Sequence, residues 1–387
     1  MISPKYFSGV FGRLLAAVAF FPAGLTAAEL ARAPTVSSPV LELAWHDVTT
    51  WGVEGRAWED QARLRYFDRL PAVAEVEARK ILDFFKTFSA WDLSHCSAGM
   101  MVRFQTDASA IHARYHLLKP DLSMFHMPST GVSGLDLYAR DPSGKWRYVQ
   151  TNKPTAQDVN GVIISGLAPG TREYALYLPL YNGVDNLEIG VPVGSHFEGL
   201  APRPKPIIFY GTSITQGGVA SRPGMAHVAI LGRRLDRPVL NLGFSGGGHM
   251  DAVIGALIAQ VDAAAYVIEC TGNMQPAMVR ANCIPLVKQL RAVRPHTPII
   301  LVEDRGFPNA WVVPEKAKYN LENNAALREC FELLQKEPDP ALYYVWGANL
   351  YGTDSEGSVD NAHASDLGFM RIADAMEPVL RKALRLE

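Results

Sequence analysis

Five short segments that are apolar throughout alternate with helical stretches over the second half of the chain, and this alternation constrains the fold most strongly. A strand with no polar face has to be buried on both sides, so the pattern predicts a parallel sheet covered by helices on both faces. The apolar segments are residues 207–210, 239–242, 266–270, 299–303 and 342–346. The helical stretches are residues 225–235, 276–293, 314–335 and 366–384.

The first half of the chain has a different character, and the change falls at residues 201–206. Pro202, Pro204 and Pro206 favour an extended connector there and exclude a helix. Before this point only residues 75–88 have a helical pattern. We predict an antiparallel β-sandwich over residues 29–200 and an α/β domain over residues 201–387, which a chain of 387 residues is long enough to hold. The strand candidates of the sandwich are residues 101–106, 134–139, 145–150, 173–178 and 187–191.

Residues 1–28 have the composition of a secretory signal. Lys5 and Arg13 are positive, residues 14–21 are apolar, and small residues precede Glu29. The apolar run is shorter than the roughly 20 residues that a membrane-spanning helix needs. We predict a cleaved signal and a mature protein that is periplasmic or secreted, without a membrane span. An uncleaved N-terminal anchor or a frayed helix is the alternative.

Charge and cysteine content exclude several classes of protein. The net charge of −2 gives no bulk attraction to nucleic acid or to an anionic membrane. No CxxC pair, zincin, EF-hand, Walker or GxGxxG pattern occurs, so we expect neither a metal nor a cofactor. The four cysteines are too few for a disulfide scaffold and are either buried thiols or the source of one bridge. They are Cys96, Cys270, Cys283 and Cys330.

The turns after the first two apolar segments carry a serine and a run of glycines. Ser213 follows Gly211 and Thr212, and a serine on a tight turn after a buried strand exposes its hydroxyl at the edge of the sheet. Its N–H also points towards an oxyanion formed on an attacked carbonyl. Gly246 begins three consecutive glycines and could supply a second N–H donor. Taken alone, such a serine is more often a cap or turn residue, and such a glycine run a flexible loop.

The third and fifth segments lead to further polar groups. Asn273 has a side-chain NH₂ that could be a third donor, although asparagine at a strand end is usually a turn former. Asp360 and His363 precede the last helical stretch; His363 would accept the proton of Ser213 and Asp360 would orient the imidazole. Alternatively Asp360 is only a helix cap and His363 a surface residue. Because ligands bind beyond the carboxyl ends of parallel strands, we expect these groups to meet at one edge.

Together these turns resemble the four sequence blocks of the SGNH (GDSL-type) hydrolases. Residues 211–224, GTSITQGGVASRPG, are similar to an exported bacterial subgroup, as are residues 91–99 (WDLSHCSAG), 134–138 (GLDLY) and 177–184 (YLPLYNGV). The resemblance implies a flavodoxin-like three-layer α/β/α domain preceded by an all-β, jelly-roll-like sandwich. Thr212 stands where the family usually has Asp, and the carboxylate of the triad comes from the DxxH block.

The resemblance implies a serine esterase with Ser213, His363 and Asp360 as catalytic triad. Ser213, Gly246 and Asn273 would form the oxyanion hole. A carbohydrate acetylesterase is the expected activity, with a small-molecule or glycan ester as substrate. The sequence leaves open the acyl group, the alcohol, the oligomeric state and the role of the first domain.

Two other functions remain as alternatives. A glycoside hydrolase would use Glu303 and Asp304, but adjacent residues on an extended chain point to opposite sides. A non-catalytic carbohydrate-binding protein would keep the scaffold alone. Tryptophans of the first domain could stack on sugars or belong to the core, and Arg222 could meet a substrate or form an ion pair. These tryptophans are Trp45, Trp51, Trp58, Trp91 and Trp146.

Overall fold

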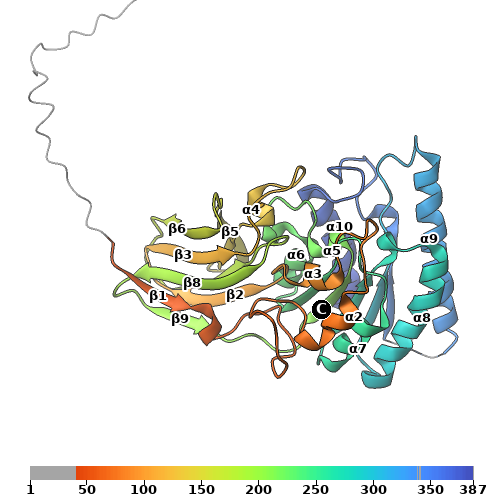
Figure 1. Ribbon diagram of the computed structural model, residues 1–387, viewed down its shortest axis with the longest axis horizontal. Coiled ribbons are helices and arrows are strands. Elements are labelled where there is room, and N and C mark those ends of the chain that lie inside the picture. The colour runs from red at the N-terminus through yellow and green to blue at the C-terminus, as the bar shows by residue number, and fades with distance from the viewer. Residues whose placement is uncertain (1–40, 338, 340, 387) are drawn as a thin grey trace, which may run out of the picture. The chain divides into compact units, whose positions relative to one another are not determined.

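Two antiparallel sheets packed face to face form the first part of the structure. The computed structural model describes residues 41–386 except 338 and 340, so the predicted signal lies outside the described residues. One sheet has the order β1-β8-β3-β6 and the other the order β5-β4-β7-β2-β9 (Figure 1). The first contains β1 (Leu43–Asp47), β8 (Val184–Pro192), β3 (Ala110–Leu117) and β6 (Asp158–Ser165). The second contains β5 (Trp146–Thr151), β4 (Asp136–Arg140), β7 (Arg172–Tyr177), β2 (Met101–Thr106) and β9 (Phe197–Leu200).

Alternating apolar side chains from both sheets fill the space between them. On β3, for example, Ile111, Ala113 and Tyr115 are buried. They share one core with Phe104 of β2 and Leu176 of β7. The sandwich predicted from sequence is therefore confirmed, and so are its five strand candidates. The prediction missed β1, β3, β6 and β9.

A five-stranded parallel sheet of order β11-β10-β12-β13-β14 forms the second part. This order places the first strand between the second and the third, which is the flavodoxin-like arrangement. The predicted three-layer α/β/α fold is confirmed, and all five strand candidates form strands. They are β10 (Ile207–Gly211), β11 (Val239–Gly243), β12 (Ala265–Glu269), β13 (Ile299–Val302) and β14 (Leu342–Val345).

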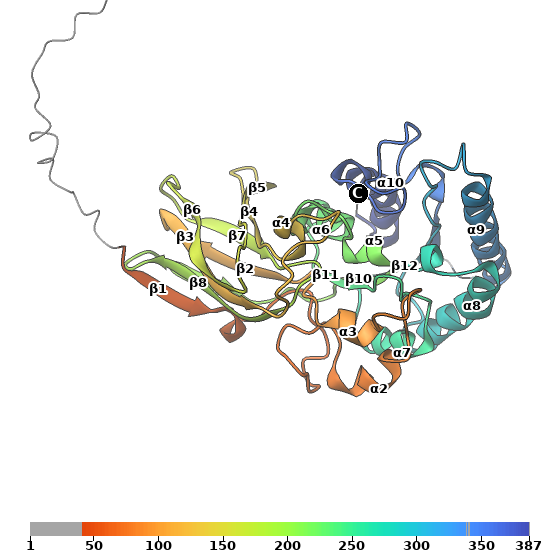
Figure 2. The same ribbon diagram turned by 45° about the horizontal axis from the view of Figure 1, so that its top comes forward.

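Helices cover the two faces of the parallel sheet because its strands are buried on both sides. On one face α6 (His227–Arg234) and α10 (Asp366–Leu384) pack against side chains such as Phe209 and Val267. On the other face α7 (Ala252–Gln260), α8 (Pro276–Val293) and α9 (Pro314–Leu334) pack against Tyr210 and Ile268. Figure 2 shows β10, β11 and β12 between these layers.

Residues 57–93 also pack on the parallel sheet, although they precede the sandwich strands β2 to β9 in sequence. Trp58 and Trp91 are buried in the core shared with α7 to α9, and the Trp58 Nε1–H donates to the carbonyl of Leu257 (3.0 Å). These two tryptophans are therefore core residues. The division into domains at residues 200 and 201 remains a prediction.

The predicted helix at residues 75–88 is wrong in its length. Here α2 (Glu75–Ala78) ends after one turn, and α3 (Ala90–Ser94) starts with a capping box between Ser89 and Asp92. Between them the chain folds back, with the N–H of Asp83 donating to the carbonyl of Phe88 (2.9 Å). Ala78 and Ile81 face the core, but Phe84, Phe85 and Phe88 are exposed, so packing does not stabilise a helix over the whole stretch. The remaining short helices are α4 (Ser129–Val132) and α5 (Ser213–Gln216).

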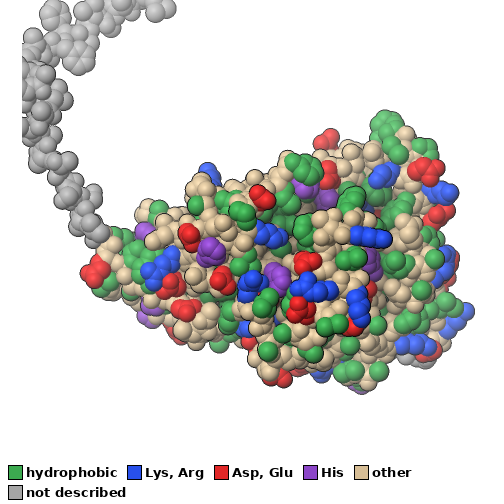
Figure 3. Space-filling model, in the orientation of Figure 1, with side chains coloured by type: hydrophobic (Ala, Val, Ile, Leu, Met, Phe, Trp, Pro, Cys, Tyr) green, Lys and Arg blue, Asp and Glu red, His purple; other side chains and the backbone are tan. Residues whose placement is uncertain are grey.

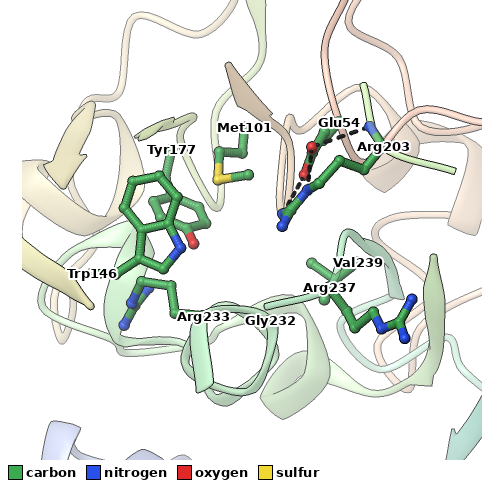
Figure 4. Close-up of a pocket in the computed structure, with 10 residues that line it drawn as sticks. Glu54, Met101, Trp146, Tyr177, Arg203, Gly232, Arg233, Arg237 and Val239 are labelled. Atoms are coloured by element: carbon green, nitrogen blue, oxygen red, sulfur yellow. Dashed lines mark hydrogen bonds and ion pairs between the residues drawn. The ribbon is translucent and has the colours of Figure 1, made fainter. Parts of the chain in front are cut away.

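A buried carboxylate connects the sandwich with the chain that leads into the parallel sheet. Glu54 accepts hydrogen bonds from the Arg203 side chain (2.8 and 3.0 Å; Figure 4) and from Arg103 (3.1 Å). Across from Glu54 and Arg203, Trp146 and Arg233 line the other side of a cavity of about 10 Å³. Such a space holds about one water molecule, so it is not a substrate site.

The surface charge, the helices and the cysteines of the described residues can each be compared with the expectations from sequence. Charged side chains of both signs are interspersed on the face that Figure 3 shows. Within the described residues, no helix is long and apolar enough to cross a membrane. All four cysteines are buried free thiols, so no bridge forms.

Arg69 is a fully buried cation that binds only backbone carbonyls. Its guanidinium donates to the carbonyls of Cys96 (2.9 Å), Leu93 (2.7 Å), Asn241 (3.1 Å) and Gly243 (2.7 Å). Burial lowers its pKa to about 10, so it stays charged at neutral pH. Arg69 thereby joins the segment around α3 to the carboxyl end of β11.

Arg69→Met should lower the free energy of unfolding by about 3 kcal/mol or more, because four buried carbonyls lose their donor. Urea denaturation measures the change. The control is Arg280→Met, which removes an exposed ion pair with Glu329 and should leave the free energy of unfolding nearly unchanged. Equal losses in the two variants would contradict the structural role of Arg69.

Candidate active site

Ser213 begins a one-turn helix directly after β10. Thr212 caps this helix, since its hydroxyl accepts the N–H of Ile214 (3.2 Å) and its own N–H donates to the Thr215 hydroxyl (3.2 Å). A side chain at Gly211 would collide with Thr215, so the strand can approach the turn this closely only with glycine. The threonine in place of the family's usual aspartate thus serves as the cap of the turn.

His363 and Asp360 form a hydrogen-bonded series with Ser213. The His363 Nε2 atom lies 2.9 Å from the Ser213 hydroxyl oxygen, and its Nδ1 atom lies 2.7 Å from the Asp360 carboxylate. The second carboxylate oxygen accepts the backbone N–H groups of Ala362 (3.0 Å) and His363 (2.7 Å). The structure therefore brings the three predicted triad residues into line.

The pKa of Asp360 lies well below its usual range. Burial by itself raises this pKa, but the hydrogen bonds from the His363 ring and backbone, together with the attraction of that ring, outweigh burial. Asp360 is therefore ionised at neutral pH and holds the Nδ1–H tautomer of His363. In that tautomer Nε2 carries a lone pair that can accept the proton of Ser213.

Gly246 and Asn273 lie on the two neighbouring turns. The loop of Gly246 is tied to α5, because the N–H of Ser245 donates to the Gln216 side chain (3.1 Å). The Asn273 side-chain oxygen is assigned to the N–H groups of Gly247 and Gly248 (3.2 Å each), which turns its NH₂ away from this loop. Both residues line the same cavity as Ser213.

Ser213, His363, Gly246 and Asn273 line one cavity of about 580 Å³. This is the size range of sites that bind small molecules. Most of its remaining lining comes from residues 83–85 and from residues 305–319, which contribute aromatic rings together with the charged side chains of Asp83, Arg305, Glu315 and Lys316. The four predicted groups thus share one cavity. Asp360 does not line this cavity but is hydrogen-bonded to His363, which does.

Two further residues near the triad were not assigned from the sequence. The Tyr181 hydroxyl donates to the carbonyl of Ser213 (3.3 Å), although Tyr181 comes from the sandwich. The His126 Nε2 atom lies 3.9 Å from Asp360. Within residues 41–386, His126, Asp360 and His363 are the one group with the spacing of metal ligands, but two of them already bind each other. The motif YLPLYNGV contains Tyr181 and was the one available signal.

Arg222 forms an ion pair and does not line the cavity. Its guanidinium donates to the buried Asp136 (2.8 Å), which also accepts the N–H of Gly224 (2.8 Å). On the other side of this loop the Ser221 hydroxyl donates to Asp366 (2.5 Å), the first residue of α10. The loop after the nucleophile turn is therefore held by the sandwich and by the helix that follows His363.

The alternative carboxylate pair is engaged elsewhere. Glu303 accepts hydrogen bonds from Arg328 (2.5 Å) and Tyr344 (2.7 Å). Asp304 binds Arg305 (2.5 and 2.6 Å). Both carboxylates are buried, and neither lines the cavity of Ser213. This arrangement gives no support to a glycoside hydrolase.

Comparisons with known proteins agree with the fold. Residues 204–381 match the sequence model of the GDSL-like lipase/acylhydrolase family. Residues 43–197 match the model for the N-terminus of SGNH-hydrolase-type esterases. No curated protein matches the sequence.

Several solved structures have the same fold. A protein from Bacteroides ovatus described as a GDSL-like lipase has a TM-score of 0.80 and 29% identity, over 89% of this chain and 99% of that one. The salicylyl-acyltransferase SsfX3 of a tetracycline biosynthetic pathway has a TM-score of 0.67 and 19% identity, over 89% and 98%. A family two carbohydrate esterase from Cellvibrio japonicus has a TM-score of 0.54 and 13% identity, over 89% and 98%. The chain belongs to the SGNH (GDSL-type) hydrolase family.

Asp360→Asn should reduce stability in a way that depends on pH. A carboxylate with a lowered folded pKa contributes stability above its unfolded pKa of about 3.9 and loses it as pH falls through the folded value. The difference in free energy of unfolding between native protein and variant should be constant from about pH 5 to 7 and shrink below about pH 4. Urea denaturation at stepped pH measures it, and a difference that grows on acidification would contradict the assignment.

Proposed function

We propose that the protein is a serine esterase that uses Ser213, His363 and Asp360 as its triad. The observation that carries this proposal is the unbroken series of hydrogen bonds from the Ser213 hydroxyl through His363 to Asp360. Membership of the SGNH hydrolases supports the same chemistry.

The reaction would proceed in two acyl transfers. The Ser213 oxygen attacks the ester carbonyl while its proton passes to His363 Nε2, and the carbonyl oxygen becomes an oxyanion. The alcohol leaves with the proton from His363, and the acyl group remains on Ser213. Water then attacks the acyl-enzyme in the same way and releases a carboxylic acid.

Three donors would stabilise the oxyanion in both steps. They are the N–H groups of Ser213 and Gly246 and the side-chain NH₂ of Asn273. Support comes from their shared cavity and from the amide orientation of Asn273, whose oxygen is occupied by the glycine loop. Donors fixed before the reaction need no reorganisation as the charge develops.

A carbohydrate ester, and an acetyl ester in the first place, is the proposed substrate. The resemblance to the exported subgroup supports it. The solved structures with this fold include a family two carbohydrate esterase from Cellvibrio japonicus and an acetyl xylan esterase from Butyrivibrio proteoclasticus. Action on glycans outside the cell would fit the predicted signal at residues 1–28.

Ser213→Ala should abolish both ester hydrolysis and covalent labelling by a fluorophosphonate, since it removes the attacking oxygen. Labelling is read by mass spectrometry and hydrolysis by release of 4-nitrophenol from its acetate. Ser245→Ala, in the same cavity, is the control and should keep the label. A native protein that takes no label, or a labelled Ser213→Ala variant, would refute the triad.

Asn273→Ala should lower kcat by about 10²–10³-fold, the usual cost of losing one oxyanion donor. The loss should be smaller than that of Ser213→Ala. Steady-state kinetics with 4-nitrophenyl acetate measures it, and circular dichroism shows whether the variant is folded. Full turnover in a folded variant would remove Asn273 from the oxyanion hole.

A further inference from the structure

The cavity beside Ser213 is much larger and more apolar than an acetyl group requires. Its volume is about 580 Å³, and an acetyl group, with only two carbon atoms, would fill a small part of that space. Aromatic rings form two of its walls, one with Phe84 and Phe85 and one with Phe307 and Tyr319. These four side chains are called the aromatic walls below.

The first aromatic wall sits on a loop that is held in place. The N–H of Asp83 donates to the carbonyl of Phe88 (2.9 Å), and the N–H of Thr87 donates to the Asp83 side chain (2.6 Å). Yet Phe84 is 56% exposed and Phe85 is 87% exposed. A firmly hydrogen-bonded loop thus presents two phenyl rings to solvent at the rim of the cavity.

The second aromatic wall is fixed as well. The N–H of Phe307 donates to the Asn320 side chain (3.1 Å), and the Phe307 ring packs edge-on against Tyr319 with centroids 6.0 Å apart. Beyond it Trp311 of the same segment is 81% exposed. Charged side chains also belong to this wall: Arg305 pairs with Asp304 (2.5 and 2.6 Å), the Lys316 Nζ atom lies 4.2 Å from the centre of the Phe307 ring, and Glu315 lines the cavity beside it.

Rings that stay exposed contribute no burial free energy to folding. Exposed apolar groups around a concave site mark a surface that a ligand covers. Walls of rings match a flat apolar ligand, because aromatic pairs favour stacked or edge-to-face contacts. A ligand that contains a ring fits such walls.

Each wall adjoins one of the proposed oxyanion donors. A Cβ at Gly246 would lie 2.8 Å from the Cβ of Asp83, so the first wall rests against that donor. The Tyr319 hydroxyl donates to the carbonyls of Gly272 (3.1 Å) and Met274 (2.9 Å), which flank Asn273. The second wall also reaches the residue before His363, because the Arg305 Nε–H donates to the carbonyl of Ala362 (3.0 Å). The first wall, which adjoins the oxyanion donor Gly246, is therefore the side on which we place the acyl group.

We propose that the aromatic walls bind the acyl group of the substrate and that this group is a flat apolar ring, as in an aromatic carboxylic ester. The inference rests on the proposed esterase function. Ser213 forms a bond to the aroyl carbonyl, the alcohol leaves with the proton of His363, and water then releases the aromatic carboxylic acid. The site accordingly accepts aroyl esters as well as acetyl esters of the same alcohol, and the aromatic walls add affinity for the aroyl group alone.

The test compares 4-nitrophenyl benzoate with 4-nitrophenyl acetate, which share one leaving group. For the double variant Phe84→Ala/Phe307→Ala, the ratio of kcat/KM for benzoate to that for acetate should fall about tenfold, as expected for two lost ring contacts. Leu321→Ala, an exposed side chain on α9, is the control and should leave the ratio unchanged. Fluorophosphonate labelling confirms that each variant has a competent Ser213.

Each outcome separates the two proposals. An unchanged ratio in a labelled double variant overturns the aromatic acyl site while the esterase function stands. A fall for benzyl acetate against ethyl acetate, without a change for benzoate, overturns it too, because the ring would then belong to the alcohol. Absence of labelling and of all hydrolysis in the native protein refutes the esterase function itself.

Discussion

The geometry of the site depends on one contact at the carboxyl edge of the parallel sheet. There the backbone of the loop after β11 packs directly on the backbone of the turn after β10. A side chain at Gly248 would collide with the carbonyl of Gly211, so the glycine loop after β11 touches the turn after β10 without any intervening atoms. Ser213 and Gly246 belong to these two turns. Their mutual placement is therefore set by main-chain contact, which has far fewer alternative arrangements than contact between side chains.

The sandwich contributes side chains that hold the two turns of the site in place. Its Tyr181 donates to the carbonyl of Ser213, and its Asp136 holds the loop that follows the nucleophile turn. Arg69 ties the end of β11 to the segment around α3 from the opposite side. Groups distant in sequence thus brace both turns, which is how a site made of loops keeps a fixed geometry.

The sequence was sufficient for elements whose pattern is set locally. Fully apolar runs identified every strand of the parallel sheet, and the strand-end rule placed Ser213, Gly246, Asn273 and His363 at one edge. The helix expected at residues 75–88 failed because its phenylalanines suggested a buried face that no neighbour provides. Tyr181 and Arg69 could not be assigned from sequence either, since their roles depend on partners over 30 and 170 residues away respectively.

The four cysteines determine how the fold is held together. Each thiol is buried and free, and burial raises the pKa of Cys270 well above its ordinary value, so that sulfur stays protonated and unreactive. No covalent cross-link contributes to the stability of the fold. Cys283 and Cys330, however, contact each other through their thiols, so an oxidant would act first on this pair, deep between the helices that cover one face of the parallel sheet.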